Sequence, residues 1–348
     1  MSTAPAESPA PAGAQRTAVL GAGSWGTTFA KVIADAGHPV TIWARRQEVA
    51  EEIRAHGTNS AYLGDLALGA GVSATADARA ALEGASTVVL AVPAQSLRDN
   101  LREFGAAIPP EAIVVSLMKG IEVSSGKRMS EVIAEATGHD PARIAVVSGP
   151  NLAKEIAHGQ PTATVIAAPE LAAAEAVAEL TANSYFRPYT HTDVVGVELG
   201  GAVKNVIALA VGLCDGQGLG DNSKASIITR GLAETTRLAL ALGAQSHTLS
   251  GLAGLGDLVA TCASPLSRNR SFGRLLGTGM SVAEAAAETK QVAEGVKSAP
   301  AVLALGEAHG VDLPITQAIT AVLDGRLRVD ELGPLLLSRK RKTEGPAA

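Results

Sequence analysis

Cysteine, aromatic residues and excess basic charge are all scarce in this chain of 348 residues, and each shortage excludes a class of protein. Two cysteines, Cys214 and Cys262, cannot build a disulfide framework or a four-ligand zinc site. The seven histidines show no metal-binding spacing, so we predict no metal. Twenty-nine Lys and Arg against 34 Asp and Glu give a net charge of −5, which argues against a nucleic-acid partner. Because aromatic residues make up only 3%, the core must be built mostly from Ala, Val, Leu and Ile.

The uncharged stretches do not have the composition of a membrane span. The longest, 238–256, contains four glycines and five polar side chains, so we expect no stable membrane insertion. Residues 1–15 carry three prolines among alanines and no apolar segment, which predicts a disordered extension rather than a signal peptide. Residues 338–348 include four consecutive basic residues and predict a disordered, solvated tail, with attraction to an anionic surface as the alternative. These features together predict a cytoplasmic protein.

Two kinds of hydrophobic pattern divide the chain. In the first part, short β-branched runs alternate with helical patterns, which predicts a Rossmann-type α/β domain with a doubly wound parallel sheet over 16–197. The expected strands are 17–20, 39–44, 87–92, 112–117, 144–147, 162–168 and 185–189. The expected helices include 25–36, 96–104, 129–136 and one that starts at Glu170. From 198 to 337 only helical spacing remains, over 200–213, 223–242, 281–289, 299–309 and 314–323, which predicts an all-α domain.

Glycine is abundant, at 37 residues, and one cluster of glycines has a clear purpose. Residues 21–26, Gly-Ala-Gly-Ser-Trp-Gly, follow the first expected strand and open the first expected helix. Gly21 allows the tight turn, Gly23 lets the backbone approach a pyrophosphate, and Gly26 lets helix and strand pack closely. The pattern predicts a dinucleotide site, with a purely structural turn as the alternative.

The end of the second expected strand indicates which dinucleotide binds. An acidic residue there would bind the ribose 2′-hydroxyl of NAD, but this chain has Arg45 and Arg46 instead. Two guanidinium groups suit a 2′-phosphate, so NADP(H) is favoured and NAD(H) stays possible. The alternative is a solvated pair of arginines.

Several polar residues follow the carboxyl ends of expected strands, where parallel sheets form their ligand crevice. Lys119 comes just after 112–117, and Ser148-Gly149-Pro150-Asn151 comes after 144–147. We interpret Lys119 as a residue that meets substrate or nicotinamide, against the alternative of an ordinary surface lysine. The small residues at 148–151 let the backbone approach a ligand, although a plain turn explains them equally well.

Lys204 lies on a predicted helix that is apolar nearly all round. Ile207, Ala208 and Val211 share its face, so an ammonium there would have a lowered pKa and could exchange a proton near neutral pH. This predicts a general acid or base, against a lysine that extends past its apolar stem to solvent. Asp257, at the end of a glycine-rich run, could orient the lysine or a substrate hydroxyl. Residues 267–270, Ser-Arg-Asn-Arg, suit a small phosphate group, or alternatively form a solvated basic helix end.

With these motifs in view, the chain resembles the NAD-dependent glycerol-3-phosphate dehydrogenase family from residue 16 to about 335. The matching segments are GAGSWGTTFA (21–30), MKGIE (118–122), SGPNLAKEIA (148–157), AVKNVIALAVG (202–212), ITRGLAE (228–234), GLAGLGDLVATC (251–262), SRNRSFG (267–273) and VAEGVKSA (292–299). The resemblance implies reversible reduction of dihydroxyacetone phosphate to sn-glycerol 3-phosphate for glycerophospholipid synthesis. It also implies a helical domain like the C-terminal domain of 6-phosphogluconate dehydrogenase, and a homodimer.

The resemblance implies a role for each matching site residue. Lys204 would exchange the proton, and Lys119 would hold substrate near the nicotinamide. The substrate pocket would include Lys119, Gly149, Asn151, Lys204, Asp257, Ser267, Arg268 and Asn269. The dinucleotide would be contacted by Gly21, Gly23, Ser24, Trp25, Gly26, Arg45, Arg46, Lys119, Ala153, Arg268, Val292 and Glu294. The chain departs from the pattern at Asn151, where relatives usually carry Ser or Thr.

Two other functions fit parts of this pattern. One is another two-domain NAD(P)-dependent dehydrogenase of 2- or 3-hydroxy acids, against which the predicted phosphate site at 267–270 argues. The other is a non-catalytic dinucleotide sensor, against which the presence of Lys119, Lys204 and Asp257 together argues.

Overall fold

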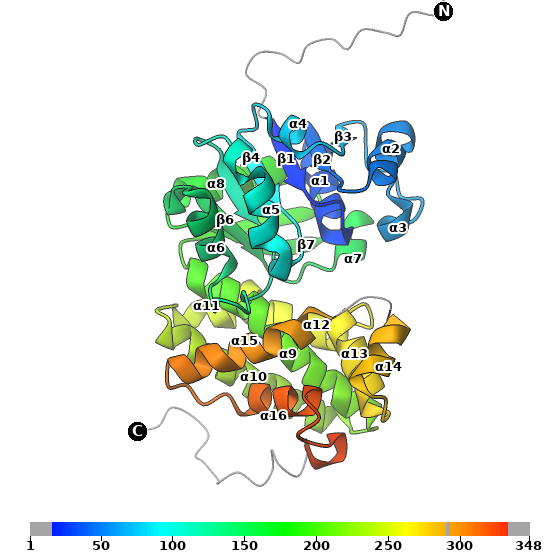
Figure 1. Ribbon diagram of the computed structural model, residues 1–348, viewed down its shortest axis with the longest axis vertical. Coiled ribbons are helices and arrows are strands. Elements are labelled where there is room, and N and C mark those ends of the chain that lie inside the picture. The colour runs from blue at the N-terminus through cyan, green and yellow to red at the C-terminus, as the bar shows by residue number, and fades with distance from the viewer. Residues whose placement is uncertain (1–15, 290–292, 333–348) are drawn as a thin grey trace, which may run out of the picture.

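A computed structural model describes residues 16–289 and 293–332, which form an α/β part and a helical part arranged end to end (Figure 1). The centre of the α/β part is an eight-stranded sheet in the order β3-β2-β1-β4-β5-β6-β7-β8. The strands are β1 (Thr17–Leu20), β2 (Val40–Trp43), β3 (Val72–Thr75), β4 (Thr87–Leu90), β5 (Ile113–Ser116), β6 (Ile144–Ser148), β7 (Thr162–Ala167) and β8 (Phe186–His191).

The six strands from β3 to β6 are parallel, and the chain leaves β1 first toward β2 and later, from β3, returns to β4 beside β1. This arrangement confirms the doubly wound Rossmann-type fold and places a ligand crevice at the carboxyl ends of β1 and β4. Every residue of β1, β4 and β6 is buried, because helices cover both faces of the sheet.

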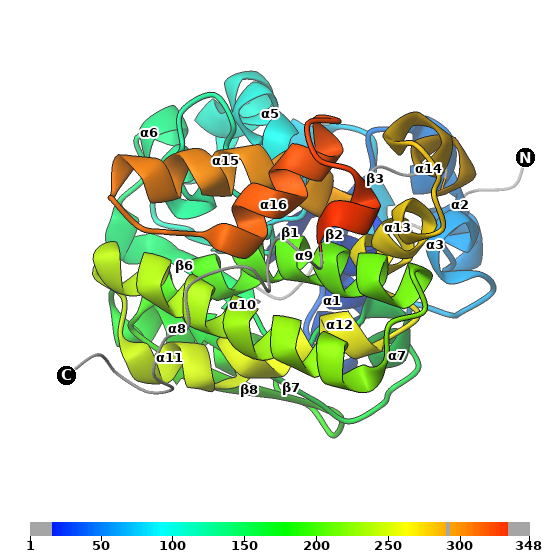
Figure 2. The ribbon, with the colours of Figure 1, turned by 90° about the horizontal axis from the view of Figure 1, so that it is seen from below.

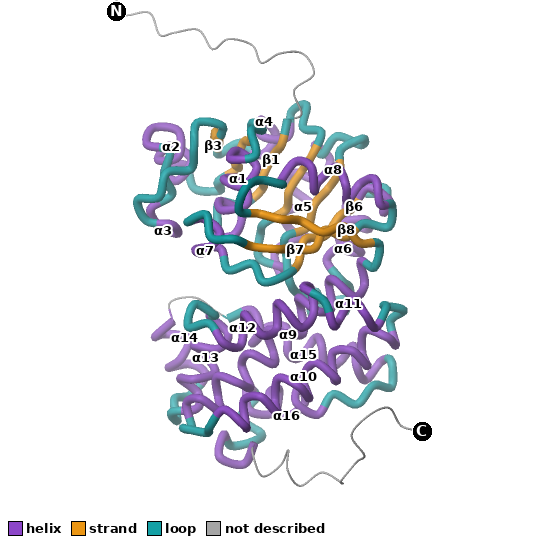
Figure 3. The backbone as a smooth tube through the Cα atoms, turned by 180° about the vertical axis from the view of Figure 1, so that it is seen from behind, coloured by secondary structure: helices purple, strands orange, loops and turns teal. Residues whose placement is uncertain are grey.

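Two features of the sheet differ from the prediction. The strand β7 pairs with β6 in the antiparallel direction, so the sheet is not wholly parallel; β7 and β8 then run parallel at its far edge (Figure 3). The connection from β6 to β7 contains only α7 (Ala153–Ala157), about 8 Å of helix, which does not carry the chain back along the strand as a parallel crossover would. The edge strand β3 was missed because only Ala74 among its four residues is buried.

The described residues of the α/β part form eight helices, most of which pack on the faces of the sheet, while α7 packs on α1. They are α1 (Ser24–Asp35), α2 (Gln47–His56), α3 (Ser60–Leu63), α4 (Ala78–Leu82), α5 (Leu97–Phe104), α6 (Met129–Thr137), α7 and α8 (Leu171–Thr181). Short 3₁₀ turns lie at η1 (Ala94–Ser96), η2 (Gly105–Ala107) and η3 (Pro141–Arg143).

The helical part is arranged around α9 (Val194–Gly216), of which all but a few end residues are buried. Viewed from the helical end, α9 runs through the middle of its neighbours (Figure 2). The other elements of the helical part are α10 (Asp221–Ala241), α11 (Ser246–Ser250), the π-helical segment η4 (Leu252–Gly256), α12 (Asp257–Ala263), α13 (Arg268–Gly277), α14 (Val282–Thr289), α15 (Glu294–Ala308), α16 (Pro314–Leu323) and the turn η5 (Val329–Glu331). The sequence prediction missed α11 to α13 and began the helix of α15 at residue 299, whereas α15 begins at Glu294 and contains Pro300.

The length and composition of α9 would also suit a membrane span. However, 94% of its most apolar 18-residue window is buried inside the protein, as expected for the central helix of a helical core. The predicted extension 1–15 and the predicted tail 338–348 lie outside the described residues.

Candidate active site

The glycine-rich turn between β1 and α1 has the backbone geometry that a dinucleotide site needs. Gly21 has a φ of +128°, and a Cβ added there would lie 2.5 Å from the carbonyl oxygen of Ala91. A Cβ added at Gly26 would overlap the carbonyl oxygen of Gly21, so both positions require glycine for close packing. At Gly23 an added Cβ would meet nothing within 4 Å, so the backbone there borders open space. The turn therefore fits a pyrophosphate at the N-terminus of α1.

Neighbouring residues support the same position for a dinucleotide. Trp25 lies in the first turn of α1, and its indole Nε1 is buried without a hydrogen-bond partner. Ala153 begins α7, and its carbonyl oxygen accepts a hydrogen bond of 3.2 Å from Thr28 Oγ1, which holds α7 beside α1. Arg45 and Arg46 follow β2 and are exposed, as the 2′-phosphate prediction requires.

A buried carboxylate joins two lysines from different parts of the chain. Lys119 lies just after β5, and its Nζ is 2.6 Å from Asp257 Oδ2 and 3.0 Å from the carbonyl oxygen of Gly149. Lys204, from α9, donates to the other oxygen of Asp257, Oδ1. The exposed fractions of the three side chains are 13% for Lys119, 9% for Lys204 and 1% for Asp257. The α/β and helical parts therefore meet at a lysine–aspartate–lysine cluster.

The environment of Lys204 lowers its pKa to about 8, chiefly because burial penalises the charged amine. The carboxylate of Asp257 acts in the opposite direction, and the positive charge of Lys119 lowers the pKa further. The alternative in which Lys204 extends to solvent is wrong, because its amine is buried and paired. A lysine with this pKa can gain or lose a proton near neutral pH.

Sequence reasoning missed a residue that touches this cluster. The hydroxyl of Thr261 accepts a hydrogen bond of 2.7 Å from Lys204 Nζ. It also lies 3.4 Å from Asp257 Oδ1. Thr261 follows Asp257 by four residues on α12, and that spacing would have indicated a shared helix face if α12 had been predicted.

The segment after β6 also reaches the cluster. Gly149 contributes the carbonyl oxygen that accepts from Lys119, while Asn151 Nδ2 donates to Thr164 Oγ1 at 3.0 Å. The Oδ1 atom of Asn151 is buried without a partner, and so is the hydroxyl of Ser148. An amide oxygen with no partner in this position is available to a donor group on a ligand.

The Ser-Arg-Asn-Arg motif forms the first turn of α13. Ser267 caps this helix, since its hydroxyl accepts from the backbone N–H of Arg270 at 3.2 Å, and Arg268 is exposed in the first turn. Asn269 is buried and donates to Asn205 Oδ1 at 2.9 Å, which ties α13 to the residue that follows Lys204. Its own Oδ1 accepts from the N–H of Gly295 at 2.8 Å, at the start of α15.

Glu294 stands beside this motif at the N-terminal end of α15. Burial raises the pKa of Glu294, while the charges of Arg268, Lys204 and Lys119 act in the opposite direction. Glu294 therefore lies within electrostatic reach of both lysines of the cluster. Val292, the other cofactor contact predicted in this region, lies outside the described residues.

Family models and known relatives match both the α/β part and the helical part of this chain. The N-terminal model of the NAD-dependent glycerol-3-phosphate dehydrogenases matches residues 16–174, and the C-terminal model matches 193–333. The glycerol-3-phosphate dehydrogenase (NAD(P)+) of Nocardia farcinica is 60% identical over 335 residues, which cover 94% of this chain and 99% of that protein. The enzyme of the same name from Thermobifida fusca is 57% identical over 330 residues, with 94% and 98% covered.

Solved structures give the same result. The crystal structure of glycerol-3-phosphate dehydrogenase from Coxiella burnetii superposes with a TM-score of 0.89 and 36% identity, covering 94% of this chain and 99% of that one. The similarity therefore includes both the sheet and the helical part.

Proposed function

The chain belongs to the NAD-dependent glycerol-3-phosphate dehydrogenase family, and we propose that the cluster of Lys119, Asp257 and Lys204 is its catalytic centre. It is an NAD(P)-dependent oxidoreductase that reversibly reduces dihydroxyacetone phosphate to sn-glycerol 3-phosphate, the precursor of glycerophospholipids. The match of both family models favours this reaction over a hydroxy acid dehydrogenase or a dinucleotide sensor. The observation that carries the proposal is the sharing of one buried carboxylate by two lysines beside the dinucleotide crevice.

In the proposed mechanism, residues 21–26 and the N-terminus of α1 hold the dinucleotide, which when bound supplies or accepts the hydride. Lys204 Nζ donates a proton to the substrate oxygen during reduction and takes it back during oxidation. Asp257 orients Lys204 and stabilises its ammonium form, and Thr261 fixes the amine from a second direction. General acid–base catalysis of this kind contributes about 10²- to 10⁴-fold to rate.

Substrate binding would rest on groups from both parts of the chain. Lys119 holds the substrate near the reacting atoms, with the backbone of Gly149 and the amide of Asn151 along the same wall. Arg268 binds the phosphate at the first turn of α13, where helix N–H groups and a guanidinium act together. Ser267 and Asn269 shape this turn through their cap and amide hydrogen bonds. Binding energy from the remote phosphate then orients the carbon that reacts.

The central test is a matched pair of lysine substitutions. Lys204→Met keeps an apolar stem of similar size and removes the amine, so we expect kcat for NADPH oxidation with dihydroxyacetone phosphate to fall about 10²-fold or more. The Kd for NADPH should stay unchanged. Lys224→Met removes a partly exposed lysine of α10 and should leave kcat unchanged. Near-normal turnover of Lys204→Met would refute the assignment.

We propose further that the enzyme prefers NADPH, on the grounds that Arg45 and Arg46 follow β2 and that the first acidic residue after this strand is Glu48, at the start of α2. Arg45→Ala with Arg46→Ala should raise the Kd for NADPH about tenfold, because charge-assisted hydrogen bonds are lost. The Kd for NADH should change little. Arg54→Ala, on the exposed side of α2, is the control. Equal losses for the two cofactors would contradict a 2′-phosphate role.

The remaining proposals concern the whole protein. We propose a dinucleotide-binding domain over 16–197, a substrate and catalytic domain over 198–337, and a homodimer in the cytoplasm, all on the support of the family resemblance. Light scattering of the purified protein tests the dimer, since a monomer mass at micromolar concentration would contradict it.

A further inference from the structure

The segment that carries Lys119 continues into a loop that contacts the helical part at three places along its length. Lys119 pairs with Asp257, and Ile121 is fully buried within the core of the helical part. At the end of the loop Arg128 and Ser130 donate to the buried carboxylate of Glu198 on α9, at 2.6 Å for each side chain. We call residues 119–130 the joint segment.

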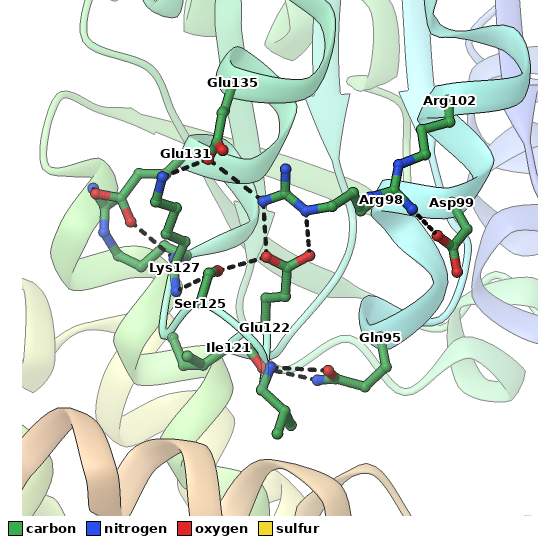
Figure 4. Close-up of polar contacts among 12 residues, drawn as sticks. Gln95, Arg98, Asp99, Arg102, Ile121, Glu122, Ser125, Lys127, Glu131 and Glu135 are labelled. Carbon is green, nitrogen blue, oxygen red and sulfur yellow. Dashed lines mark hydrogen bonds and ion pairs between the residues drawn. The ribbon is translucent and has the colours of Figure 1, made fainter.

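Gln95 fixes the backbone of the joint segment from the other side. Its Nε2 donates to the carbonyl oxygen of Ile121 at 2.8 Å, and its Oε1 accepts from the N–H of Val123 at 3.0 Å (Figure 4). Gly120 packs so closely on η1 that an added Cβ would lie 2.9 Å from the Cβ of Ala94. The loop therefore has little freedom to slide along the start of α5.

Arg98, on α5, holds the same loop by its side chain. Its Nε and one terminal nitrogen donate to the two oxygens of Glu122 at 2.9 and 2.8 Å, which is a bidentate pair (Figure 4). Ser125 Oγ donates to Glu122 at 2.5 Å. The exposed fraction of the Glu122 side chain is 7%, and Arg98 holds the pKa of this carboxyl below its usual value. A buried bidentate pair fixes geometry more firmly than an exposed ion pair does.

We propose that Glu122, together with Arg98 and Gln95, is a positioning residue that sets Lys119 against Asp257 and thereby tunes Lys204. Only two residues separate Glu122 from Lys119, so a shift of the loop moves the lysine out of its 2.6 Å contact. The hydrogen bonds given above connect Glu122, Arg98 and Gln95 to the loop, and none of them connects these side chains to the lysine–aspartate–lysine cluster. The inference rests on the proposed function, because it assigns a consequence to the placement of Lys119.

The consequence can be measured because Lys119 and Lys204 compete for one carboxylate. The charged and titratable groups around Lys204 are Asp257 and Cys262 on α12, Lys119 after β5, and Glu294 on α15. If Lys119 moves away, Lys204 loses the repulsion of a neighbouring positive charge and becomes the only lysine of the pair that binds the Asp257 carboxylate. Both changes raise the pKa of Lys204. Oxidation of glycerol 3-phosphate needs the neutral amine, and the acid limb of kcat would therefore move to higher pH.

The experiment compares two isosteric changes from the same region, Glu122→Gln and Asp99→Asn. Asp99 pairs with Arg102 on the exposed side of α5, and its side chain is 77% exposed. For Glu122→Gln we expect the acid limb of glycerol 3-phosphate oxidation to rise by about half a pH unit or more. Its kcat at neutral pH should fall about tenfold, as misplaced catalytic groups cause. The Kd for NADPH should stay within about twofold, as expected if residues 21–26 are undisturbed. Asp99→Asn should match the wild type in all three measurements.

Gln95→Ala removes a different side chain that holds the same loop. It should also shift the acid limb of glycerol 3-phosphate oxidation to higher pH. If Glu122→Gln proves unfolded by circular dichroism, Gln95→Ala and Arg98→Lys decide the matter. Unshifted limbs in the folded variants would overturn the inference while leaving Lys204 as the catalytic lysine. Failure of the wild type to oxidise NADPH with dihydroxyacetone phosphate would instead overturn the proposed function, so the two failures are distinguishable.

Discussion

At the scale of single residues, the properties of Lys204 come from its neighbours rather than from the lysine itself. Burial lowers the pKa of this amine and the carboxylate of Asp257 raises it, and together with Lys119 they leave the pKa of Lys204 at about 8. Lys119 binds the second oxygen of the Asp257 carboxylate, so the two lysines share one negative charge. Three side chains therefore set one proton affinity, and changing any of them changes the pH at which the enzyme works.

This balance predicts opposite pH dependence for the two directions of the reaction. With Lys204 in the proposed acid–base role, oxidation uses its neutral amine, so kcat for oxidation should rise with pH through about 8. Reduction then uses the ammonium, so kcat for reduction should fall through the same range. Asp257→Asn removes the group that raises the pKa of Lys204, and both transitions should then move to lower pH. Rate profiles in both directions measure this. A limb of the same sign in both directions would contradict the role of Lys204.

Sequence reasoning identified candidate site residues that lie together in the structure, but it did not predict the contacts between them. Lys119 was identified from its place after a strand, Lys204 from its apolar helix face, and Asp257 from the glycine-rich run before it. The structure brings all three together. Thr261 was missed because a threonine within an unpredicted helix carries no local signal. Contacts between residues as far apart as Lys119 and Asp257 depend on tertiary packing, which one sequence does not record.

At the scale of elements, four of the 37 glycines are explained by two helices that pack at close range. Gly212 and Gly216 on α9 face Gly273 and Gly277 on α13, and a Cβ added at any of the four would overlap backbone atoms of the other helix. This contact places Arg268, at the start of α13, near the Lys204 end of the site. The sequence pattern did not predict α13, because half of its ten residues are polar and its only large apolar residues that are buried are Phe272 and Leu276.

The close contact predicts that Gly273 cannot be enlarged without cost. Gly273→Ala would force the Cβ onto the carbonyl oxygen of Leu209, and we expect a loss of about 1–3 kcal/mol in the free energy of unfolding. Gly256→Ala is the control, since the nearest atom to its added Cβ is 3.7 Å away and the position is helical. Urea denaturation of both variants measures the difference. Equal stability of the two would show that α9 and α13 can separate freely.

At the scale of the whole molecule, the α/β and helical parts are joined by side chains that cross from one part to the other. Ile121 belongs by sequence to the α/β part and by packing to the helical core, and Glu198 crosses in the opposite direction to reach Arg128 and Ser130. The change from alternating to purely helical patterns indicated two parts, but no pattern marked Ile121 as a core residue of the second. A single isoleucine in a loop has no periodicity to read.

The distribution of aromatic residues makes this coupling measurable. Both tryptophans, Trp25 and Trp43, lie in the α/β part, so tryptophan fluorescence follows that part, whereas circular dichroism at 222 nm is weighted to the helical part. In the wild type we expect the two thermal transitions to coincide. Ile121→Ala should cost about 2–5 kcal/mol and separate them, because the cavity lies where the parts join. Ile53→Ala, in the core of the α/β part alone, should lower both transitions together. Coincident transitions in both variants would mean that Ile121 does not couple the two parts, and that other contacts between them, such as the apolar cluster of Val146, Val165 and Val197, are sufficient to do so.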